Sequence, residues 1–394
     1  MSNKVPQIRF NGYSDAWEER KLGEVSKYSN GGSYENDVVE NGTYELITLK
    51  SVNMSGKLVS SGKFINRETK TLEKDTLVMI LSEQAPGLLG MTAKIPENNR
   101  YVLNQRVAEI KPNTNIDSYF LSMSINRSQA YFSKRGAGTK VQNISKPNVE
   151  NFEFYCPSER EQQKIGSFFK HLDDTIALHQ RKLDLLKEQK KGYLQKMFPK
   201  NGAKVPELRF AGFADDWEER KFGELLKEFS IKSQIEDEYN VLSSTNSGME
   251  FREGRVSGTS NLGYKIIKNG DLVLSPQNLW LGNININNIG KGLVSPSYKT
   301  FEFRNIDSSF INPQLRTQKM LEEYKNSSTQ GASVVRRNLE IDSFYQIKIF
   351  VPTIAEQEKI GSFFKQLDNT IALHQRKLDL LKEQKAGFLQ RMFV

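Results

Sequence analysis

The chain has 394 residues, which is longer than one ordinary domain, so two or three domains are expected. Its composition, 37% hydrophobic and 26% charged, excludes a disordered chain, and no stretch approaches the ~20 apolar residues of a membrane-spanning helix. A net charge of +9 is compatible with a nucleic-acid partner. The lone Cys156 cannot pair within the chain and favours a reducing cytoplasm, and no apolar signal segment opens the sequence.

In chain order, the sequence predicts a mixed domain, a long helix, a second mixed domain and a second long helix. In the first domain, β-branched and aromatic runs predict strands at 44–50, 76–81, 91–96 and 106–112, followed by a helix at 116–132. The second domain follows suit, with strands at 239–244, 271–275 and 298–303 and a helix near 307–325. Each domain closes with an alternating apolar strand that ends in proline, at Pro157 or Pro352.

An internal repeat frames these domains. The stretch at 161–198 differs from that at 356–393 in only six of 38 positions, and both contain IALHQRKLDLLKEQK. The segment at 4–24 matches that at 204–224 in 14 of 21 positions. We call these two segments the frame segments. The regions between the repeated segments share little sequence. This pattern favours two readers of different targets that are held in one geometry.

The repeated long stretches have apolar residues at alternating spacings of four and three, which predicts a coiled-coil seam. Each helix then needs an apolar partner, and its own copy could pair with it in antiparallel orientation. The histidines in the seam are interpreted as polar residues that fix the register, and not as metal ligands. The predicted seam residues are Ile165, Phe169, Leu172, Ile176, His179, Leu183, Leu186, Ile360, Phe364, Leu367, Ile371, His374, Leu378 and Leu381.

The predicted fold class is α+β, with two mixed α/β domains, two long antiparallel coiled-coil helices and a pseudo-twofold internal repeat. The first mixed domain with its frame segment spans 1–158, and the first repeated helix spans 159–199. The second mixed domain spans 200–353, and the second repeated helix spans 354–394.

No catalytic motif stands out in the sequence. It has no GxxxxGK[ST] loop for phosphates, no HExxH and no CxxC, and three histidines with one cysteine cannot build a typical zinc site. The prediction is therefore a binding and assembly component without a catalytic residue, a metal or a cofactor of its own.

Polar loops in the two domains are the candidate binding elements. The segments FSKRGAGTKVQN at 132–143 and STQGASVVRRNL at 328–339 combine glycine with Arg, Lys, Gln and Asn, and SPQNLW at 275–280 adds two amides. Arg, Gln and Asn can read base edges in the major groove by paired hydrogen bonds. The opposing interpretation, a polar loop without a role, stays open for each residue. The candidates are Lys134, Arg135, Lys140, Gln142, Asn143, Gln277, Asn278, Gln330, Arg336, Arg337 and Asn338.

The order of these elements carries a family likeness. WEERKLGE and WEERKFGE open the two halves, PSEREQQKI and PTIAEQEKI close the two variable regions, and a repeated long helix follows each time. In this order and copy number, the chain resembles the specificity subunit of type I restriction–modification systems over essentially its whole length.

The resemblance implies that each variable region is a target recognition domain that reads one half of a split sequence in double-stranded DNA. It implies that the helices space the half-sites and dock two modification (methyltransferase) subunits, which restriction (translocase and nuclease) subunits join. The chain itself would have no active site. S-adenosylmethionine would be bound by the modification subunit, which usually methylates adenine N6, and no membrane would be involved.

Two other functions remain as alternatives to the DNA specificity subunit. One is a coiled-coil scaffold with two domains that bind ligands other than DNA, and the other is a divergent nuclease or methyltransferase that acts alone. Salt-sensitive binding to duplex DNA would favour the specificity subunit over the scaffold. Methylation by the purified chain alone would favour the enzyme.

Overall fold

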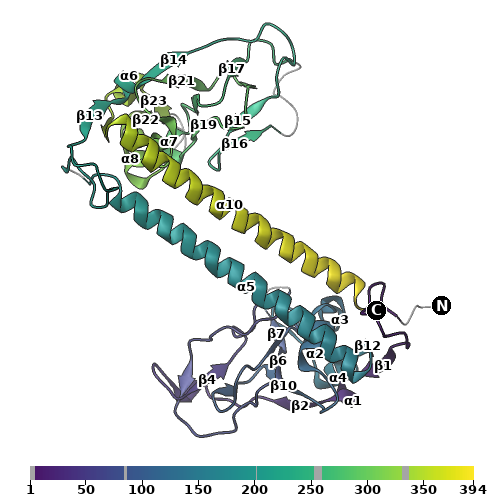
Figure 1. Ribbon diagram of the computed structural model, residues 1–394. Coiled ribbons are helices and arrows are strands. Elements are labelled where there is room, and N and C mark those ends of the chain that lie inside the picture. The colour runs from purple at the N-terminus through teal and green to yellow at the C-terminus, as the bar shows by residue number, and fades with distance from the viewer. Residues whose placement is uncertain (1–4, 84–86, 201, 253–259, 331–336) are drawn as a thin grey trace. The chain divides into compact units, whose positions relative to one another are not determined.

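The computed structural model describes residues 5–83, 87–200, 202–252, 260–330 and 337–394, which form two compact units (Figure 1). The first unit comprises Met1–Gln180 and Arg376–Val394, and the second comprises Arg181–Gln375. Each unit holds one mixed domain and a part of both long helices, α5 (Glu159–Lys196) and α10 (Ile354–Arg391). In the described residues, no helix has both the length and the apolar character needed to cross a membrane.

The elements of the two units follow one another in a similar order. The first unit has β1 (Glu18–Lys21), α1 (Leu22–Val25), β2 (Ser26–Asn30), η1 (Glu35–Asp37), β3 (Val38–Val39), β4 (Tyr44–Ile47), β5 (Phe64–Ile65), β6 (Leu77–Ile80), β7 (Ser82–Glu83), β8 (Thr92–Lys94), β9 (Tyr101–Leu103), β10 (Val107–Pro112), α2 (Ser118–Asn126), α3 (Gln129–Arg135), β11 (Gln142–Asn143), α4 (Lys146–Glu150) and β12 (Glu153–Cys156). The second has β13 (Glu218–Lys221), α6 (Phe222–Leu225), β14 (Leu226–Phe229), β15 (Leu242–Ser244), β16 (Met249–Phe251), β17 (Lys265–Ile267), β18 (Leu272–Leu274), η2 (Leu279–Leu281), β19 (Ile284–Ile286), β20 (Gly292–Val294), β21 (Lys299–Phe303), α7 (Ser308–Ile311), α8 (Gln318–Asn326), β22 (Ser328–Gln330), β23 (Arg337–Leu339), α9 (Ile341–Tyr345) and β24 (Lys348–Val351).

One four-stranded sheet has the same topology in both mixed domains, although their sequences differ. An antiparallel sheet has the order β2-β10-β6-β8 in the first unit and β14-β21-β18-β19 in the second. The strands β6 and β18, with the sequences LVMI and LVL, are buried along their whole length. A short continuous apolar run is typical of such a strand. The frame segments close each domain in the same way, because β1 pairs with β12 and β13 pairs with β24.

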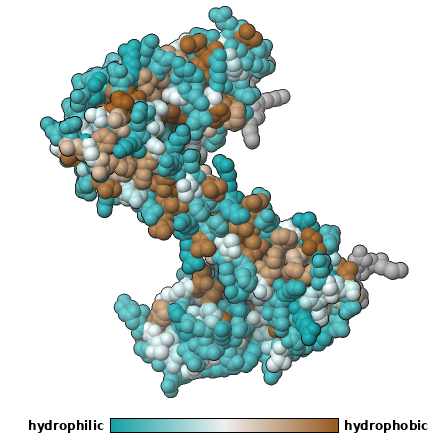
Figure 2. Space-filling model, in the orientation of Figure 1, coloured by the Kyte–Doolittle hydropathy of each residue, from teal (hydrophilic) through white to brown (hydrophobic). Residues whose placement is uncertain are grey.

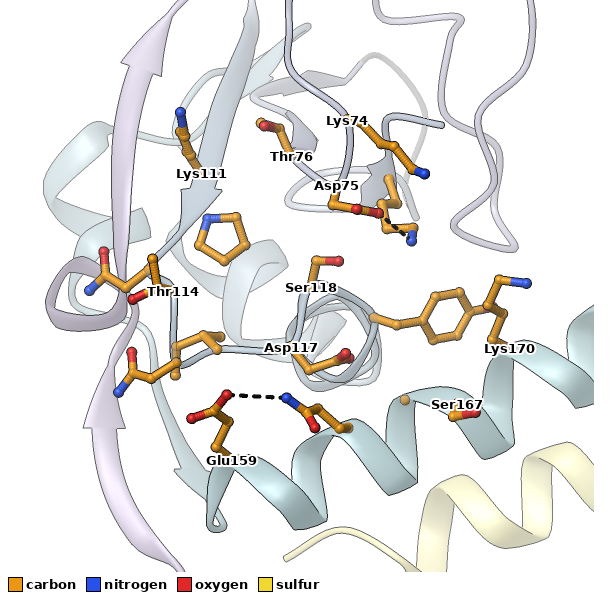
Figure 3. Close-up of a pocket in the computed structure, with 18 residues that line it drawn as sticks. Lys74, Asp75, Thr76, Lys111, Thr114, Asp117, Ser118, Glu159, Ser167 and Lys170 are labelled. Atoms are coloured by element: carbon orange, nitrogen blue, oxygen red, sulfur yellow. Dashed lines mark hydrogen bonds and ion pairs between the residues drawn. The ribbon is translucent and has the colours of Figure 1, made fainter. Parts of the chain in front are cut away.

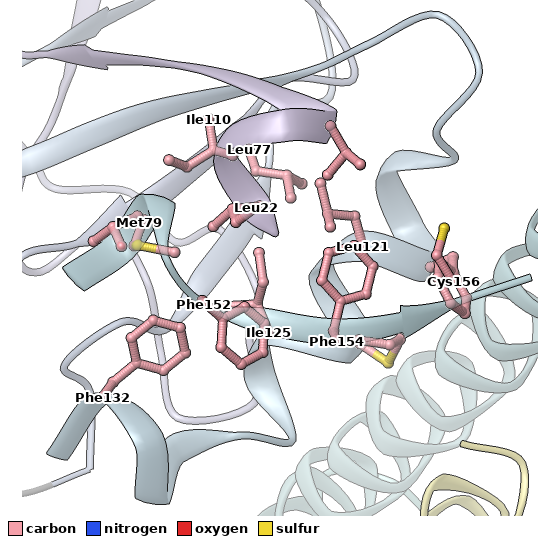
Figure 4. Packing of buried hydrophobic residues seen from close by; sticks show 14 of the residues in the cluster. Leu22, Leu77, Met79, Ile110, Leu121, Ile125, Phe132, Phe152, Phe154 and Cys156 are labelled. Atoms are coloured by element: carbon pink, nitrogen blue, oxygen red, sulfur yellow. The ribbon is translucent and has the colours of Figure 1, made fainter. Parts of the chain in front are cut away.

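The core of the first unit lies between this sheet and the helices α2 and α3 (Figure 4). Leu77 and Met79 of β6 and Ile110 of β10 pack there with Phe132 of α3 and Phe152, and each is at most 2% exposed. Burial of five such side chains contributes about 1.5–3 kcal/mol each to folding. Phe132 thereby anchors the helix that leads into the polar loop at 136–143.

The frame tryptophans are packing residues, as their place in the repeated segments indicates. Trp17 and Trp217 are each 2% exposed. Trp17 makes edge contacts with Phe120 of α2 at 5.8 Å and with Phe393, just beyond α10, at 6.2 Å. One ring therefore joins the frame segment, the mixed domain and the end of a long helix.

Two predicted helices are interrupted. The prediction at 116–132 becomes α2 and α3, because Ser128 has a non-helical backbone (φ −103°, ψ 33°) and its N–H donates to the Ile125 carbonyl instead of the Ser124 carbonyl. The prediction near 307–325 becomes α7 and α8, because Pro313 has no backbone N–H to donate. Both predictions were right in the type of element and wrong in its continuity.

A buried ion pair ties each frame segment to the first turn of a long helix. Arg9 donates to both carboxylate oxygens of Glu161, at 2.6 and 2.7 Å, and Arg209 donates to both oxygens of Glu356 at 2.7 Å. The two glutamate side chains are at most 1% exposed. A buried carboxylate is tolerated only when such a partner satisfies it, so each frame segment is required to return to its helix.

The glutamine that follows each buried glutamate clasps the mixed domain. Gln162 donates to the Pro157 carbonyl at 2.9 Å and accepts from the Asp117 N–H, just before α2, at 3.1 Å. Gln357 repeats both bonds in the second unit. Next to this contact, a side chain at Gly166 would overlap the Asp117 carboxylate, so glycine permits the close approach. We call this contact the glutamine clasp.

In each unit, segments of α5 and α10 run antiparallel to one another. In the first unit, Phe168 meets Phe388 at 5.1 Å between ring centroids, and Asp173 pairs with Lys385 at 2.7 Å. In the second, Lys190 pairs with Asp368 at 2.5 Å, and the Tyr193 ring lies 4.9 Å from the Phe363 ring. As residue numbers rise along α5, the residue numbers opposite them on α10 fall, which defines the antiparallel direction.

The predicted seam residues lie on the covered side of the helices, since none of the fourteen is exposed. Four leucines of the repeated stretch are exposed instead, and on the visible face of the molecule hydrophobic residues lie among hydrophilic ones (Figure 2). Leu178 and Leu185 on α5 are 61% and 55% exposed, and Leu373 and Leu380 on α10 are 65% and 47% exposed. A spacing of seven residues puts each pair on one stripe of its helix.

Replacement of Glu161 by Ala is expected to lower the free energy of unfolding of the first unit by about 3–5 kcal/mol, because Arg9 is left buried without its partner. Glu97, in an exposed pair with Arg100, is the matched control, and its replacement by Ala is expected to cost at most about 1 kcal/mol. Urea unfolding of both variants measures the difference. Equal losses in the two variants would contradict the role given to the buried pair.

Candidate nucleic-acid interface

The polar candidates of the first unit gather at one end of the sheet β2-β10-β6-β8. Beyond β6 the chain continues as the short strand β7, which pairs with β11 so that Ser82 lies opposite Asn143 and Glu83 opposite Gln142. The backbone of Ala137 and Asn143 exchanges two hydrogen bonds of 2.9 Å, which close the loop that carries Lys140. The sheet therefore positions this loop through backbone contacts, whatever its side chains are.

All five predicted residues of the segment 132–143 are exposed, Lys134 and Arg135 in the last turn of α3 and the other three in the loop at 136–143. They are Lys134, Arg135, Lys140, Gln142 and Asn143. Lys134 and Lys140 make no ion pair within the described residues, while Arg135 lies over the Tyr131 ring at 3.7 Å. Unpaired cationic groups on an exposed loop are available to a polyanion.

Asn143 is held in one orientation. The buried Ser82 hydroxyl donates to Asn143 Oδ1, and Asn143 Nδ2 donates to the Val141 carbonyl at 3.3 Å. A fixed amide loses little rotamer freedom when it binds a base edge. Ser82 is a residue that the sequence analysis missed, because its position next to Asn143 depends on the pairing of β7 with β11.

The candidates of the second unit come together in the same way. Gln330 and Asn338 are exposed on the hairpin of β22 and β23, and the Leu339 N–H at its base donates to the Pro276 carbonyl at 3.0 Å. This bond brings the exposed Gln277 and the half-buried Asn278 next to the hairpin. Of the two predicted arginines, Arg336 lies outside the described residues.

Arg337 has a different environment from the exposed candidates. It is half-buried, and its Nη2 donates to the Ser328 carbonyl across the hairpin at 3.3 Å. Its Nε is buried without a hydrogen-bond partner in the described part of the chain. The guanidinium therefore holds the hairpin together.

One backbone hydrogen bond that both units make identifies equivalent positions in them. The Ile144 N–H donates to the Leu81 carbonyl, as the Leu339 N–H donates to the Pro276 carbonyl. Ser82 and Glu83 thus take the places of Gln277 and Asn278. The sequence contains a faint signal of this, in LVMILSEQ at 77–84 and LVLSPQ at 272–277.

Arg106 joins the first group from a neighbouring strand. Its carbonyl accepts from the Leu81 N–H at 3.0 Å, so it lies beside the segment that leads to Ser82. Arg106 is exposed, makes no ion pair within the described residues, and has a φ of 66°. A left-handed arginine is uncommon, and such strain clusters at functional sites. No sequence signal marks Arg106, because the turn NQR lacks the glycine that this conformation favours.

A separate polar hollow of about 520 Å³ lies at the opposite end of the sheet, against α5 (Figure 3). Its lysines are largely neutralised. Lys94 pairs with Asp75 at 2.7 Å, and Lys111 pairs with Glu73 at 2.6 Å. We therefore assign the candidate interface to the loop end of the sheet and not to this hollow.

The chemistry of the interface is recognition. It offers amide, hydroxyl, ammonium and guanidinium groups, which bind phosphates and base edges. In the described residues, no group of three His, Cys, Asp or Glu side chains could hold a metal ion. The thiol of Cys156 is buried in the frame of the first unit, and burial raises its pKa to about 11.

Comparisons with known proteins agree with this geometry. A family model described as "Type I restriction modification DNA specificity domain" matches residues 14–188 and again residues 214–383. The chain is similar to the type I restriction enzyme MjaVIII specificity subunit of Methanocaldococcus jannaschii, with 21% identity over 96% of this chain and 92% of that protein. The putative MjaX specificity subunit of the same organism is 21% identical over 72% of this chain and 69% of that protein.

One solved structure shares the fold over the whole length of the chain. It is the crystal structure of a type I restriction–modification system S subunit from M. genitalium, with a TM-score of 0.66 and 16% identity. The match covers 99% of both chains.

Replacement of Arg106 by Gly is expected to weaken binding to target duplex DNA by about 1–3 kcal/mol, because the guanidinium is lost while glycine keeps the left-handed backbone. Replacement by Ala is expected to weaken binding equally and also to destabilise the first unit. Binding isotherms and urea unfolding separate the two effects. Lys74→Ala, at the hollow, is the control, and wild-type affinity in Arg106→Gly would remove Arg106 from the interface.

Proposed function

The chain belongs to the type I restriction–modification specificity subunits, and from this we propose that each of its two recognition domains reads one half of a bipartite target in double-stranded DNA. The observation that carries the proposal is the equivalence of the two candidate loops. Both occupy the same end of the same sheet and carry an equivalent asparagine, Asn143 or Asn338, yet the first adds the exposed Gln142 and Arg106 and the second adds the exposed Gln277 and Gln330. Loops that are held alike but carry different exposed side chains are suited to reading different bases.

The exposed side chains suit the major groove. Arginine pairs with guanine O6 and N7, and Asn or Gln pairs with adenine N6 and N7. In the first domain, Gln142 and Asn143 supply amides and Lys134 and Lys140 supply phosphate contacts. In the second domain, Gln277, Gln330 and Asn338 supply amides.

The long helices act in this proposal as the spacer between the two half-sites. Each is a continuous helix of 38 residues, which is ~57 Å at ~1.5 Å per residue. Half-sites that are read from one side of DNA lie about one turn, ~10 bp, apart. A rigid element of fixed length can hold two readers at such a spacing.

The repeated stretch is the proposed dock for the modification subunits. It leaves two leucines exposed on each helix, Leu178 and Leu185 on α5 and Leu373 and Leu380 on α10. The segment IALHQRKLDLLKEQK that carries them, at 176–190 and 371–385, is identical in both copies, so the two stripes suit two copies of one partner. Restriction subunits would join the complex that these modification subunits form.

The chain acts without chemistry of its own in this proposal. The candidate residues of the interface carry amide, ammonium and guanidinium groups, which bind DNA and do not react with it. S-adenosylmethionine would be bound by the modification subunit, which must extrude the target base while the specificity subunit holds the duplex in register. The alternative of a scaffold with ligands other than DNA has no support from the comparisons.

Exchange of residues 25–150 for the first variable region of another specificity subunit is expected to change one half of the methylated motif and to leave the other half intact. Methylome sequencing of cells that express the chimera with the modification subunit measures the motif. Exchange of the second variable region is the reciprocal control. A change in both halves of the motif, or in neither, would contradict the proposal that each domain recognises one half of the target.

Replacement of Leu178 and Leu185 by Glu is expected to remove one of the two modification subunits, because a charged group is placed in an apolar contact. The pair Leu373→Glu and Leu380→Glu is expected to remove the other. Native mass spectrometry of the assembled complex counts the subunits. The control is Gln163→Glu, which adds to α5 the residue that α10 carries as Glu358. Two bound modification subunits in both leucine variants would contradict the dock.

A further inference from the structure

The first recognition domain is bonded to the long helices at a second point, away from the glutamine clasp. Tyr119 of α2 donates its phenol hydrogen to Asp173 of α5 at 2.5 Å. Asp173 also pairs with Lys385 of α10, at 2.7 and 2.9 Å from its two oxygens. The three residues lie in the first unit and join one domain helix to both long helices.

This second contact is shielded from water. The side chains of Asp173 and Lys385 are only 9% and 16% exposed, so the carboxylate needs both partners to replace its lost hydration. Burial, followed by the hydrogen bond to Asp173, raises the pKa of the Tyr119 phenol far above its usual value. The phenol therefore stays a donor at every working pH.

The two contacts are well separated on α5. Gln162 of the clasp and Asp173 are eleven residues apart, which is ~16 Å along a helix at ~1.5 Å per residue. The domain also packs on the ends of both long helices, for example through Phe120 on Phe393 at 5.4 Å between ring centroids, but apolar contacts are not directional. Two directional bonds that are three helical turns apart restrict rotation of the domain more than the clasp and this packing do.

In its described residues, the second unit keeps the clasp and has no hydrogen bond equivalent to that of Tyr119. Ser309 takes the place of Tyr119, two residues after the aspartate of the clasp, and its hydroxyl turns back to Asp307 of its own domain. Asp368, the copy of Asp173, pairs with Lys190 and keeps 41% of its side chain exposed. Arg316 is the basic group of the domain that is electrostatically coupled to Asp368, yet its guanidinium donates to the Asn246 carbonyl.

We propose that Tyr119 is a positioning residue that locks the first recognition domain onto the helix frame and thereby restricts the spacer length that the complex accepts. The proposal rests on the bipartite reading proposed above. One base pair more or less moves a half-site by ~3.4 Å along the DNA axis and rotates it around that axis. A domain held by both directional bonds resists the turn that this shift requires, whereas a domain held by the clasp and apolar packing resists it less.

The test uses the complete chain assembled with its modification subunits. The probe is a library of duplexes that carry the wild-type half-sites with spacers of every length within three base pairs of the preferred one. In Tyr119→Phe the ring remains and only the hydroxyl is lost. We expect methylation at spacers one base pair shorter or longer to rise about tenfold relative to the preferred spacer, the factor that corresponds to loss of one hydrogen bond to a charged group. The half-site bases are expected to stay the same.

The matched control is Tyr34→Phe. Tyr34 is a half-buried tyrosine of the same domain whose phenol bonds to Thr69 within that domain, at 2.9 Å. Its loss is expected to leave the spacer distribution unchanged. A spacer distribution in Tyr119→Phe that is no wider than wild type would overturn the proposal, even if overall methylation falls, because a purely structural role lowers all spacers alike. If the wild-type complex methylates no bipartite site, it is the proposed function that fails.

Discussion

The buried pair of Arg9 and Glu161, repeated as Arg209 and Glu356, is the constraint on which the rest of the structure depends. A carboxylate at the start of a long helix is nearly without solvent contact, so the frame segment has to return and satisfy it. That return places the tryptophan of the frame against the mixed domain and sets β1 beside β12. The adjoining Gln162 then fixes α2. One dipeptide, Glu-Gln, thus joins the frame, the helix and the domain.

Much of the fold could be predicted from the sequence where the signal is long or repeated. The seam residues recur over 38 positions in two copies, and a period sustained over that length has few competing interpretations. The helix breaks at Ser128 and Pro313 were missed, because a short polar residue and one proline count little against a long apolar run. Strands of two or three residues, such as β5 and β7, were also missed, since their partners define them and their own sequence does not.

The same distinction separates the interface residues that were predicted from the sequence from those that were missed. Gln142 and Asn143 were found because they are exposed polar residues of a glycine-containing loop, which is visible in sequence. Arg106 and Ser82 were missed because they reach the interface only through the register of neighbouring strands. Arg337 has a loop-like sequence but is half-buried and bonded across its own hairpin. Composition identifies the loops, and backbone pairing decides which side chains they present.

The repeated segments and the variable domains therefore contribute unequally to how each domain is held against the long helices. Because the clasp uses a backbone N–H of the domain, any domain with the right turn before its helix can accept it. The Tyr119 contact uses a side chain instead, and only the acceptor Asp173 and its partner Lys385 belong to the frame. An exchanged domain that has this turn would be held by the clasp whatever the rest of its sequence is. Whether it arrives with a tyrosine at this position would decide how firmly it is held, so a new domain would bring with it both its bases and its tolerance for spacing.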